Sequence, residues 1–402
     1  MKRFFFVAIL ALPSWLLIGV LSAQAQTETV LFSFGYGDGQ YPTSRLTSDG
    51  AGNFYGTTLF GGNRGNVFEL SPNGSGGWNE SVLYSFCFEG YPSCADGAQP
   101  FLSYVVIDRA GNLYGTTEYG GATGYGVVFE LSPDGAGWKE TVLHNFGVTS
   151  GADGSVPING LVMDSAGNLY GTTFSGGGCG CGTVFELSPS GDGWTERVIY
   201  ATDMGYAGLA MDAAGNIFGA NASTVFQLSP NGHGGWNPTV IHTFSGGPKD
   251  GSDPQGTPVL DQTGNIYGTT AYGGAKNFGT VYKLIPGKKG KWTEKILHSF
   301  KGGPKDGGAP VSGIALDLAG NLYGTTQSGG EYSNSNPYGD GTVFELTAPV
   351  GKGSYKEKIL WNFNGTDGSE PIDSLILDSA GNLYGTTAYG GLNDGIVFEV
   401  TP

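Results

Sequence analysis

The sequence predicts an all-β protein, a seven-bladed β-propeller with four strands in each blade. Short runs rich in aromatic and branched residues recur along the chain, four in each repeat unit. The two ends of the chain carry complementary parts of one unit. The motif Gly-Asn-(Leu/Ile/Phe)-(Tyr/Phe)-Gly occurs seven times, 48 to 61 residues apart, beginning at Gly52, Gly111, Gly167, Gly215, Gly264, Gly320 and Gly381. Units of this length with four short strands are typical of propeller blades.

The N-terminal segment has the pattern of a secretory signal. Lys2 and Arg3 precede an apolar stretch over residues 4–21, and Ala23-Gln24-Ala25 supplies the small-x-small pattern that signal peptidase recognises. The stretch is only marginally as long as the about 20 residues of a membrane span. We therefore predict a signal peptide over 1–25 and a single propeller domain over 26–402, secreted or periplasmic and without a membrane span.

The chain is strongly acidic, with a formal net charge of −16, and loss of Lys2 and Arg3 with the signal peptide would make it −18. Such a charge repels nucleic acid and anionic membrane surfaces. We predict no nucleic-acid partner, and we expect a monomer.

The strands follow a fixed order within each unit. In the third unit the runs lie over 160–164, 168–173, 182–188 and 195–201, each bounded by Gly, Pro, Asn or Asp. None has helical length or periodicity. We expect the run that ends at Asp to be the innermost strand and the other three to follow outward.

The chain ends predict how the ring closes. Residues 28–34 match the fourth run of other units, such as 140–146, whereas residues 395–400 match the third run. We therefore predict that residues 27–34 form the outer strand of the last blade, whose other strands lie within 372–400. This closure would remove two exposed sheet edges.

The units Gly-Asn-Leu-Tyr-Gly-Thr-Thr-x-x-Gly-Gly and Gly-Thr-Val-Phe-Glu-Leu-Ser-Pro resemble the GloVer (Gloeo-Verruco) tandem repeat of exported bacterial proteins. The resemblance covers residues 27–402. It implies extracellular or surface exposure, and it implies no particular activity.

Two repeated features are assigned to structure. The Asp of each Asp-x-x-Gly-Asn sequence is expected to accept hydrogen bonds from backbone N–H groups two residues further on. The ring that opens each outermost strand is expected to pack on the neighbouring blade, although an exposed aromatic rim would also stack on sugars. These rings are Trp78, Trp138, Trp194, Trp236, Trp292 and Tyr355.

Histidines show no catalytic pattern. His144, His242 and His298 share one repeat position, where other units carry Phe32, Tyr84, Tyr200 and Trp361, so the position favours a flat ring rather than a base. His233 lies in a turn. We therefore predict no catalytic triad, no metal site and no cofactor, with calcium at the aspartate loops as the alternative.

The four cysteines form two local pairs. In an exported protein such pairs favour disulfides over metal, and we predict a Cys87–Cys94 bridge. Cys179 and Cys181 would close a small, strained ring. A disulfide, a soft-metal site and a redox site are all open for this pair.

Two further repeated elements are candidates for ligand binding. Each is present in six of the seven units, and both are expected on one face of the propeller. Alternatively, Asp-Gly is simply good turn chemistry and Thr-Thr good strand chemistry. The first is the Asp of Asp-Gly-x-x-Pro, at Asp38, Asp96, Asp153, Asp250, Asp306 and Asp367. The second is the first Thr of Gly-Thr-Thr-x-x-Gly-Gly, at Thr57, Thr116, Thr172, Thr269, Thr325 and Thr386.

The fourth unit departs from both patterns. Residues 201–208 replace Asp-Gly-x-x-Pro, and residues 219–223 replace the Gly-Thr-Thr-x-x-Gly-Gly segment. Short loops beside long ones predict a notch there, to which ligand contact would be biased. The alternative is a decayed copy.

The predicted function is an exported, non-catalytic binding module for a carbohydrate, a cation or a protein. One alternative is an extracellular lyase or hydrolase acting on a polysaccharide or small substrate, and another is a structural cell-surface element. A glycosidase needs two carboxylates about 5–10 Å apart. Aspartates spaced around a propeller axis are expected to lie further apart.

Overall fold

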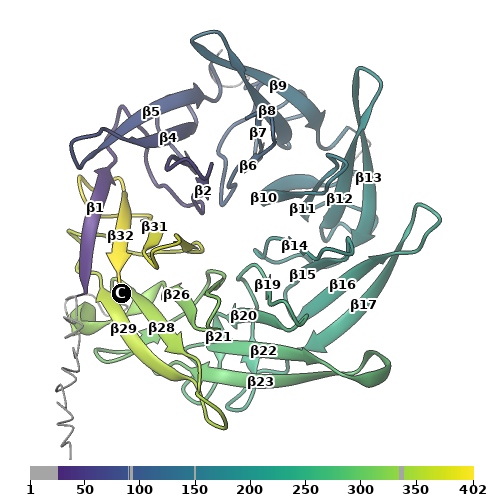
Figure 1. Ribbon diagram of the computed structural model, residues 1–402. Coiled ribbons are helices and arrows are strands. Elements are labelled where there is room, and N and C mark those ends of the chain that lie inside the picture. Colours follow the sequence, from purple (N-terminus) through teal and green to yellow (C-terminus); the bar gives the residue numbers. More distant parts are fainter. Residues whose placement is uncertain (1–25, 89, 91–93, 149–150, 335–338) are drawn as a thin grey trace, which may run out of the picture.

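The computed structural model describes residues 26–88, 90, 94–148, 151–334 and 339–402. Seven four-stranded antiparallel sheets surround a central axis (Figure 1). In six of these sheets the strands run outward in chain order, and in the seventh the N-terminal strand is outermost, so the predicted seven-bladed propeller is confirmed. The predicted signal peptide lies outside the described residues and stays a prediction. Within those residues, no helix has the length and hydropathy needed to cross a membrane.

The first four blades are continuous runs of four strands. They contain β2 (Thr47–Ser48), β3 (Phe54–Thr58), β4 (Asn66–Pro72) and β5 (Trp78–Ser85) in blade 1; β6 (Val106–Ile107), β7 (Leu113–Thr117), β8 (Val127–Asp134) and β9 (Gly137–Asn145) in blade 2; β10 (Ser155–Met163), β11 (Leu169–Ser175), β12 (Thr183–Ser190) and β13 (Gly193–Ala201) in blade 3; and β14 (Ala210–Met211), β15 (Ile217–Ala220), β16 (Thr224–Pro230) and β17 (Trp236–Thr243) in blade 4.

The last three blades follow the same order, and blades 5 and 6 each carry an extra two-stranded sheet. They contain β19 (Val259–Leu260), β20 (Ile266–Thr270), β22 (Thr280–Pro286) and β23 (Trp292–Ser299) in blade 5; β25 (Ala315–Leu316), β26 (Leu322–Thr326), β28 (Thr342–Thr347) and β29 (Lys356–Asn362) in blade 6; β30 (Ile376–Leu377), β31 (Leu383–Thr387) and β32 (Ile396–Thr401) in blade 7; and the extra pairs β18 (Gly251–Ser252) with β21 (Tyr272–Gly273), and β24 (Gly307–Gly308) with β27 (Ser328–Gly329).

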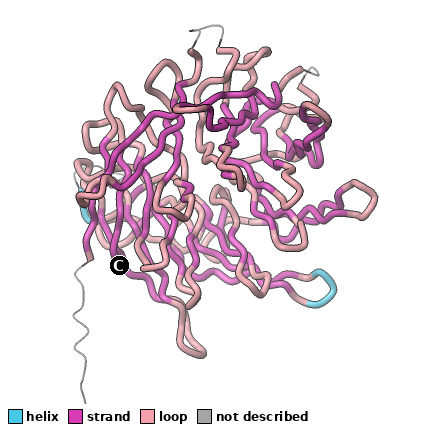
Figure 2. Tube along the Cα trace, turned by 45° about the horizontal axis from the view of Figure 1, so that its top comes forward, coloured by secondary structure: helices cyan, strands magenta, loops and turns pink. Residues whose placement is uncertain are grey.

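Helical structure in the described residues is limited to two single turns, η1 (Lys288–Gly290) and η2 (Glu331–Asn334). The first caps the β22–β23 hairpin, which projects from the ring at the right of Figure 2. The turns between third and fourth strands therefore extend away from the body of the propeller.

The ring closes through the N-terminal strand. β1 (Thr27–Ser33) pairs antiparallel with β32, from Thr27 opposite Thr401 to Ser33 opposite Ile396. Figure 1 shows the two strands side by side, purple against yellow. The predicted closure is confirmed, and the outer edge of β32 is paired, as an inner strand of a propeller blade requires.

In each blade, an aromatic side chain on the third strand packs over a glycine on the second strand. Gly56 on β3 lies opposite Phe68 on β4, and a Cβ at Gly56 would lie 2.5 Å from the Cζ of Phe68. The same pair recurs in all seven blades, with Tyr282 as the ring in blade 5. The last glycine of the seven-fold motif is therefore needed to admit the ring.

A second aromatic ring joins each blade to the next. Phe34, which follows β1, packs edge-on against Phe68 of blade 1 with ring centroids 5.0 Å apart, and both side chains are fully buried. The equivalent pair Phe146–Phe185 joins blades 2 and 3 at the same distance. Edge-to-face contacts of this kind stabilise beyond the area they bury.

The packing of Phe34 tests whether the closing strand belongs to the core. We expect Phe34→Ala to lower the free energy of unfolding by about 3–5 kcal/mol, because it leaves a cavity in the closing junction. Phe146→Ala is the matched change at an internal junction and should cost a similar amount. Denaturant unfolding of both variants measures this, and a much smaller loss for Phe34→Ala would contradict closure through the N-terminal strand.

Candidate functional site on the loop face

One face of the propeller, which we call the loop face, is formed by the segments that follow the outermost strands and by the segments that join second to third strands. In blades 5 and 6 these two segments pair as β18–β21 and β24–β27, and in blade 2 Ala98 bridges Tyr119. The two repeated elements therefore lie on the same face, as predicted. The glycine after each aspartate is needed here, since a Cβ at Gly97 would lie 2.4 Å from the Oγ1 of Thr117.

The first threonines, which were predicted as ligand-binding candidates, are buried in the structure. All six side chains are at most 4 % exposed. The Oγ1 of Thr57 donates to the carbonyl of Ser103 at 3.0 Å, and that of Thr116 donates to the carbonyl of Asn159 at 2.9 Å. The hydroxyls of Thr269, Thr325 and Thr386 likewise donate to the inner segment of the next blade, whereas that of Thr172 donates to the Ile158 carbonyl of its own blade at 3.2 Å. The six buried threonines are Thr57, Thr116, Thr172, Thr269, Thr325 and Thr386.

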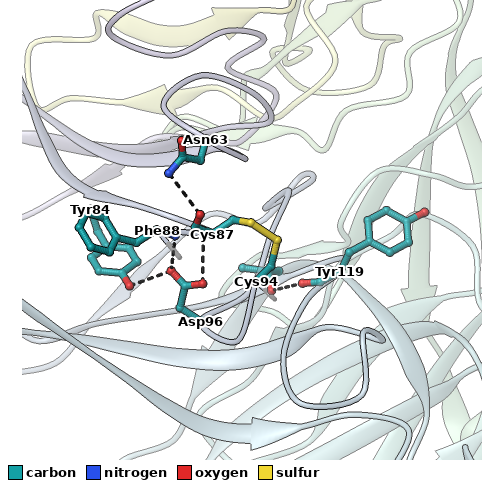
Figure 3. The surroundings of a disulfide bond; sticks show 8 residues. Asn63, Tyr84, Cys87, Phe88, Cys94, Asp96 and Tyr119 are labelled. Carbon is teal, nitrogen blue, oxygen red and sulfur yellow. Dashed lines mark hydrogen bonds between the residues drawn. A yellow bond between two sulfur atoms is a disulfide. The ribbon is translucent and has the colours of Figure 1, made fainter. Parts of the chain in front are cut away.

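The aspartates also point away from the axis. Asp96 accepts hydrogen bonds from the Tyr84 hydroxyl at 2.9 Å and from the N–H groups of Cys87 at 3.0 Å and Phe88 at 3.3 Å (Figure 3). Each Asp lies between its own blade and the next one, and none is fully exposed. These candidate aspartates therefore lie at the blade junctions, and their predicted role in ligand binding stays a prediction: Asp38, Asp96, Asp153, Asp250, Asp306 and Asp367.

Each of these aspartates lies near a glutamate on the outermost strand of the next blade. Burial, followed by the negative charge of Asp38, raises the pKa of Glu80 to about 7, and burial with Asp96 does the same for Glu140. The other four pairs are Asp153 with Glu196, Asp250 with Glu294, Asp306 with Glu357, and Asp367 with Glu28. Two carboxyl groups that share a junction disfavour the doubly charged state.

Blade 4 lacks both members of this pair. Pro238 stands where the other outermost strands carry glutamate, and the segment 201–208 that faces it lacks Asp-Gly-x-x-Pro. The two carboxylates are therefore present together at six junctions and absent together at the seventh. This pattern indicates that the pair is one structural unit.

Both cysteine pairs are disulfides in the structure. Cys87 bonds to Cys94 within the segment that carries Asp96, as Figure 3 shows. Cys179 bonds to Cys181 in the segment between β11 and β12. Both bridges lie in loop-face segments and hold them in compact turns.

A hollow of about 160 Å³ opens at the centre of the loop face. Most of its wall comes from residues that follow a proline and lead into the innermost strands, and Tyr206 and Gln327 come from other loop-face segments. Apart from the predicted notch that holds Tyr206, no pattern in the sequence marks these as binding residues. The wall is more apolar than polar, and its residues are Phe101, Leu102, Asn159, Tyr206, Gln255, Thr257, Val311, Ser312, Gly313, Gln327, Ile372 and Asp373. Ligand sites commonly combine an apolar wall with a few fixed polar groups.

Asp373 is the one carboxylate in the described wall of this hollow. Its Oδ2 accepts a hydrogen bond from the N–H of Arg45 at 2.6 Å, and its Oδ1 accepts one from the N–H of Ser374 at 2.6 Å. Burial nevertheless raises the pKa of Asp373 to about 6. The guanidinium of Arg45 lies over the ring of Tyr104, 4.1 Å from its centre.

The notch predicted at the fourth unit contributes directly to the hollow. Tyr206, from segment 201–208, lines it with 41 % of its surface exposed. The side-chain amide of Asn159 donates to the carbonyl of Tyr206 at 2.5 Å, and the ring of Phe174 lies 5.4 Å from that of Tyr206. The irregular unit therefore places an accessible aromatic ring beside the axis.

Other exposed aromatic side chains lie in loop-face segments outside the hollow. Tyr119, Tyr272 and Tyr389 occupy one repeat position in the segments between second and third strands, and they are 42–52 % exposed. In contrast, the rings that open the outermost strands pack between blades, as Trp194 does on Tyr114 and Trp236 on Tyr170. The accessible aromatic surface is thus on the loop face rather than at the outer rim.

Comparison with known proteins identifies the repeat. Residues 81–223 and 220–402 match the model of the Gloeobacter/Verrucomicrobia repeat. The chain belongs to this family. A search of curated protein sequences returned no significant match.

Solved structures share the fold of this Gloeobacter/Verrucomicrobia repeat protein. Virginiamycin B lyase from Staphylococcus aureus is 13 % identical, with a TM-score of 0.57 over 94 % of this chain and 99 % of the lyase. The extracellular domain described for a hybrid two-component system of B. thetaiotaomicron is 14 % identical, with a TM-score of 0.55 over 94 % of this chain. The repeat protein spans 41 % of that second chain. At these identities the similarity concerns the fold.

The junction glutamates make stability depend on pH. A carboxyl group whose pKa is raised in the folded state stabilises the fold below its unfolded pKa and loses that contribution as pH rises through the folded value. With pKa values near 7 for Glu80 and Glu140, we expect the melting temperature to fall between pH 5 and pH 8. His144, whose pKa is lowered by burial, opposes this trend in the acidic part of the range.

Thermal melts of Glu80→Gln/Glu140→Gln against pH measure the effect. The double variant should lose less melting temperature over this range than the parent, since an amide does not ionise. Glu331→Gln, at an exposed glutamate of η2, is the control and should follow the parent. A double variant with the parent's pH profile would contradict the assignment.

Proposed function

We propose that this protein is an exported, non-catalytic binding module, and that its ligand is a hydroxyl-rich carbohydrate held at the central hollow of the loop face. The observation that carries the proposal is the composition of the hollow's wall. Amide and hydroxyl groups of Asn159, Gln255 and Thr257 lie beside the rings of Phe101 and Tyr206. Sugars present alternating hydroxyl groups and apolar ring faces, and such a wall complements both.

The size and charge of the hollow support a small neutral group. Its volume is about 160 Å³, which is small for a binding site. One carboxylate lies in the wall, whereas a glycosidase of the usual kind requires two. Exposed tyrosines elsewhere on the loop face, such as Tyr272 and Tyr389, offer further surface on which a longer chain of sugars would stack.

An extracellular lyase or hydrolase is the second candidate. Asp373 favours it, because a carboxyl group with a pKa of about 6 inside a hollow is suited to proton transfer near neutral pH. The similarity in fold to virginiamycin B lyase is an analogy at the level of the fold. Asp373→Asn separates the two candidates: it should abolish turnover by an enzyme and leave carbohydrate binding within a few-fold.

Binding is tested by a glycan array, followed by calorimetric titration of the glycans that bind. We expect Tyr206→Ala to weaken binding about two- to tenfold, because loss of an aromatic stacking contact costs about 0.5–1.5 kcal/mol. Its melting temperature should change little, since Tyr206 is 41 % exposed.

Tyr36→Ala is the matched control, because Tyr36 is 86 % exposed and does not line the hollow. It should bind as the parent does. If both tyrosine variants bind equally well, or if no glycan binds, the central hollow is not a carbohydrate site.

A further inference from the structure

Two of the blade junctions bring a histidine to the carboxylate pair. His298 on β23, Asp306 in the segment that follows, and Glu357 on β29 of the next blade converge so that one ligand atom from each lies within 4.8 Å of the others. His242 on β17, Asp250 and Glu294 on β23 form the same arrangement one junction earlier. The three outermost strands involved lie next to one another in Figure 1.

The distances in these clusters are too long for hydrogen bonds. The Nε2 of His298 lies 3.5 Å from Asp306 and 3.5 Å from Glu357, and that of His242 lies 3.6 Å from Asp250 and 3.7 Å from Glu294. Hydrogen bonds from nitrogen to oxygen span about 2.7–3.2 Å. Both Nε2 atoms are buried and have no hydrogen-bond partner.

The same distances suit the corners of a metal site. A tetrahedral Zn²⁺ holds nitrogen and oxygen ligands at about 2.0–2.2 Å, so its ligand atoms lie about 3.3–3.6 Å apart. The three side chains around His298 are largely buried, with 15 %, 6 % and 16 % of the His298, Asp306 and Glu357 side chains exposed. An ion at the centre of either cluster would have three protein ligands and an open position.

Asp306 adds an independent indication. The residue is 4 % exposed, and its Oδ1, the atom nearest to His298, is buried without a hydrogen bond. Its Oδ2 is occupied by the N–H of Lys301 at 3.1 Å and lies 3.8 Å from the Lys301 ammonium group. A buried carboxylate oxygen without a donor is costly, and a cation between it and Glu357 would offset that cost.

The corresponding residues at other junctions do not form a complete set of three ligands. Tyr84 occupies the same repeat position in blade 1, and its hydroxyl donates directly to Asp96 at 2.9 Å. His144 in blade 2 lies 3.4 Å from Asp153, but Glu196 does not complete a group of three ligand atoms with them. Among the described residues the complete set therefore occurs at two junctions.

We propose that the junctions between blades 4 and 5 and between blades 5 and 6 each bind a divalent transition-metal ion of the Zn²⁺ type. Imidazole together with carboxylate suits zinc, whereas calcium prefers oxygen ligands alone. The ion's two positive charges balance the two carboxylates. Bound there, it joins the outermost strands of adjacent blades, so it stabilises the ring independently of any ligand at the loop face.

Zinc binding to the purified, chelator-treated protein tests this by calorimetric titration, and Co²⁺ provides visible absorption bands that report a low-coordinate site. We expect two equivalents of Zn²⁺ per chain and a higher melting temperature with zinc than with chelator. His298→Tyr and His242→Tyr should each leave one equivalent, and the double variant none. Tyrosine is chosen because Tyr84 and Tyr200 occupy this position in other blades.

His233→Tyr is the control, since His233 lies in an exposed turn, and it should keep both equivalents. In chelator the double histidine variant should melt within a few degrees of the parent. Should it fail to fold, Glu294→Gln/Glu357→Gln serves instead and is also expected to bind no zinc tightly. Absence of saturable binding below about 100 µM, or two equivalents retained by either double variant, would overturn the proposal.

Discussion

The contact between an aromatic ring on one blade and the third strand of the next is the interaction on which the rest of this structure depends. Phe34 on Phe68, Phe146 on Phe185 and their counterparts occur at every junction, with Tyr200 on Phe226 before the irregular blade. Because the ring is closed, no junction can loosen without straining the others. The N-terminal strand shares this packing through Phe34, so the first described residues hold the last blade in place.

Polar chemistry is arranged around these aromatic contacts. On the face opposite the loop face, each Asp-x-x-Gly-Asn turn is held by its own carboxylate, as when Asp108 accepts from the N–H groups of Ala110 and Asn112. At the loop face, aspartate and glutamate from adjacent blades share a junction instead. The repeat therefore places titratable groups where the blades meet. The central hollow, in contrast, is lined by residues that differ from unit to unit.

Most of the architecture could be predicted because it depends on local pattern repeated seven times. Four short strands, a glycine under an aromatic ring and a turn-forming aspartate recur in each unit, and recurrence removes the ambiguity of any one copy. The candidate ligand residues were predicted less well. Thr57 and Asp96 recur because both lie where every blade meets its neighbour, Thr57 through its hydrogen bond to Ser103 and Asp96 beside Glu140. The sequence pointed to the irregular segment 201–208, but it did not single out Tyr206 within that segment.

The sequence by itself determined the number of blades, their strand order and the closure by residues 27–34, because these follow from the spacing of one motif and the matching of the two ends. Only the tertiary structure decided which side chains meet across a junction. His298 and Glu357 are separated by 59 positions, and the repeat position of His298 holds Phe, Tyr or Trp in four of the other six units. The meeting of imidazole and carboxylates depends on how one blade docks on the next, which no pattern within a single unit specifies.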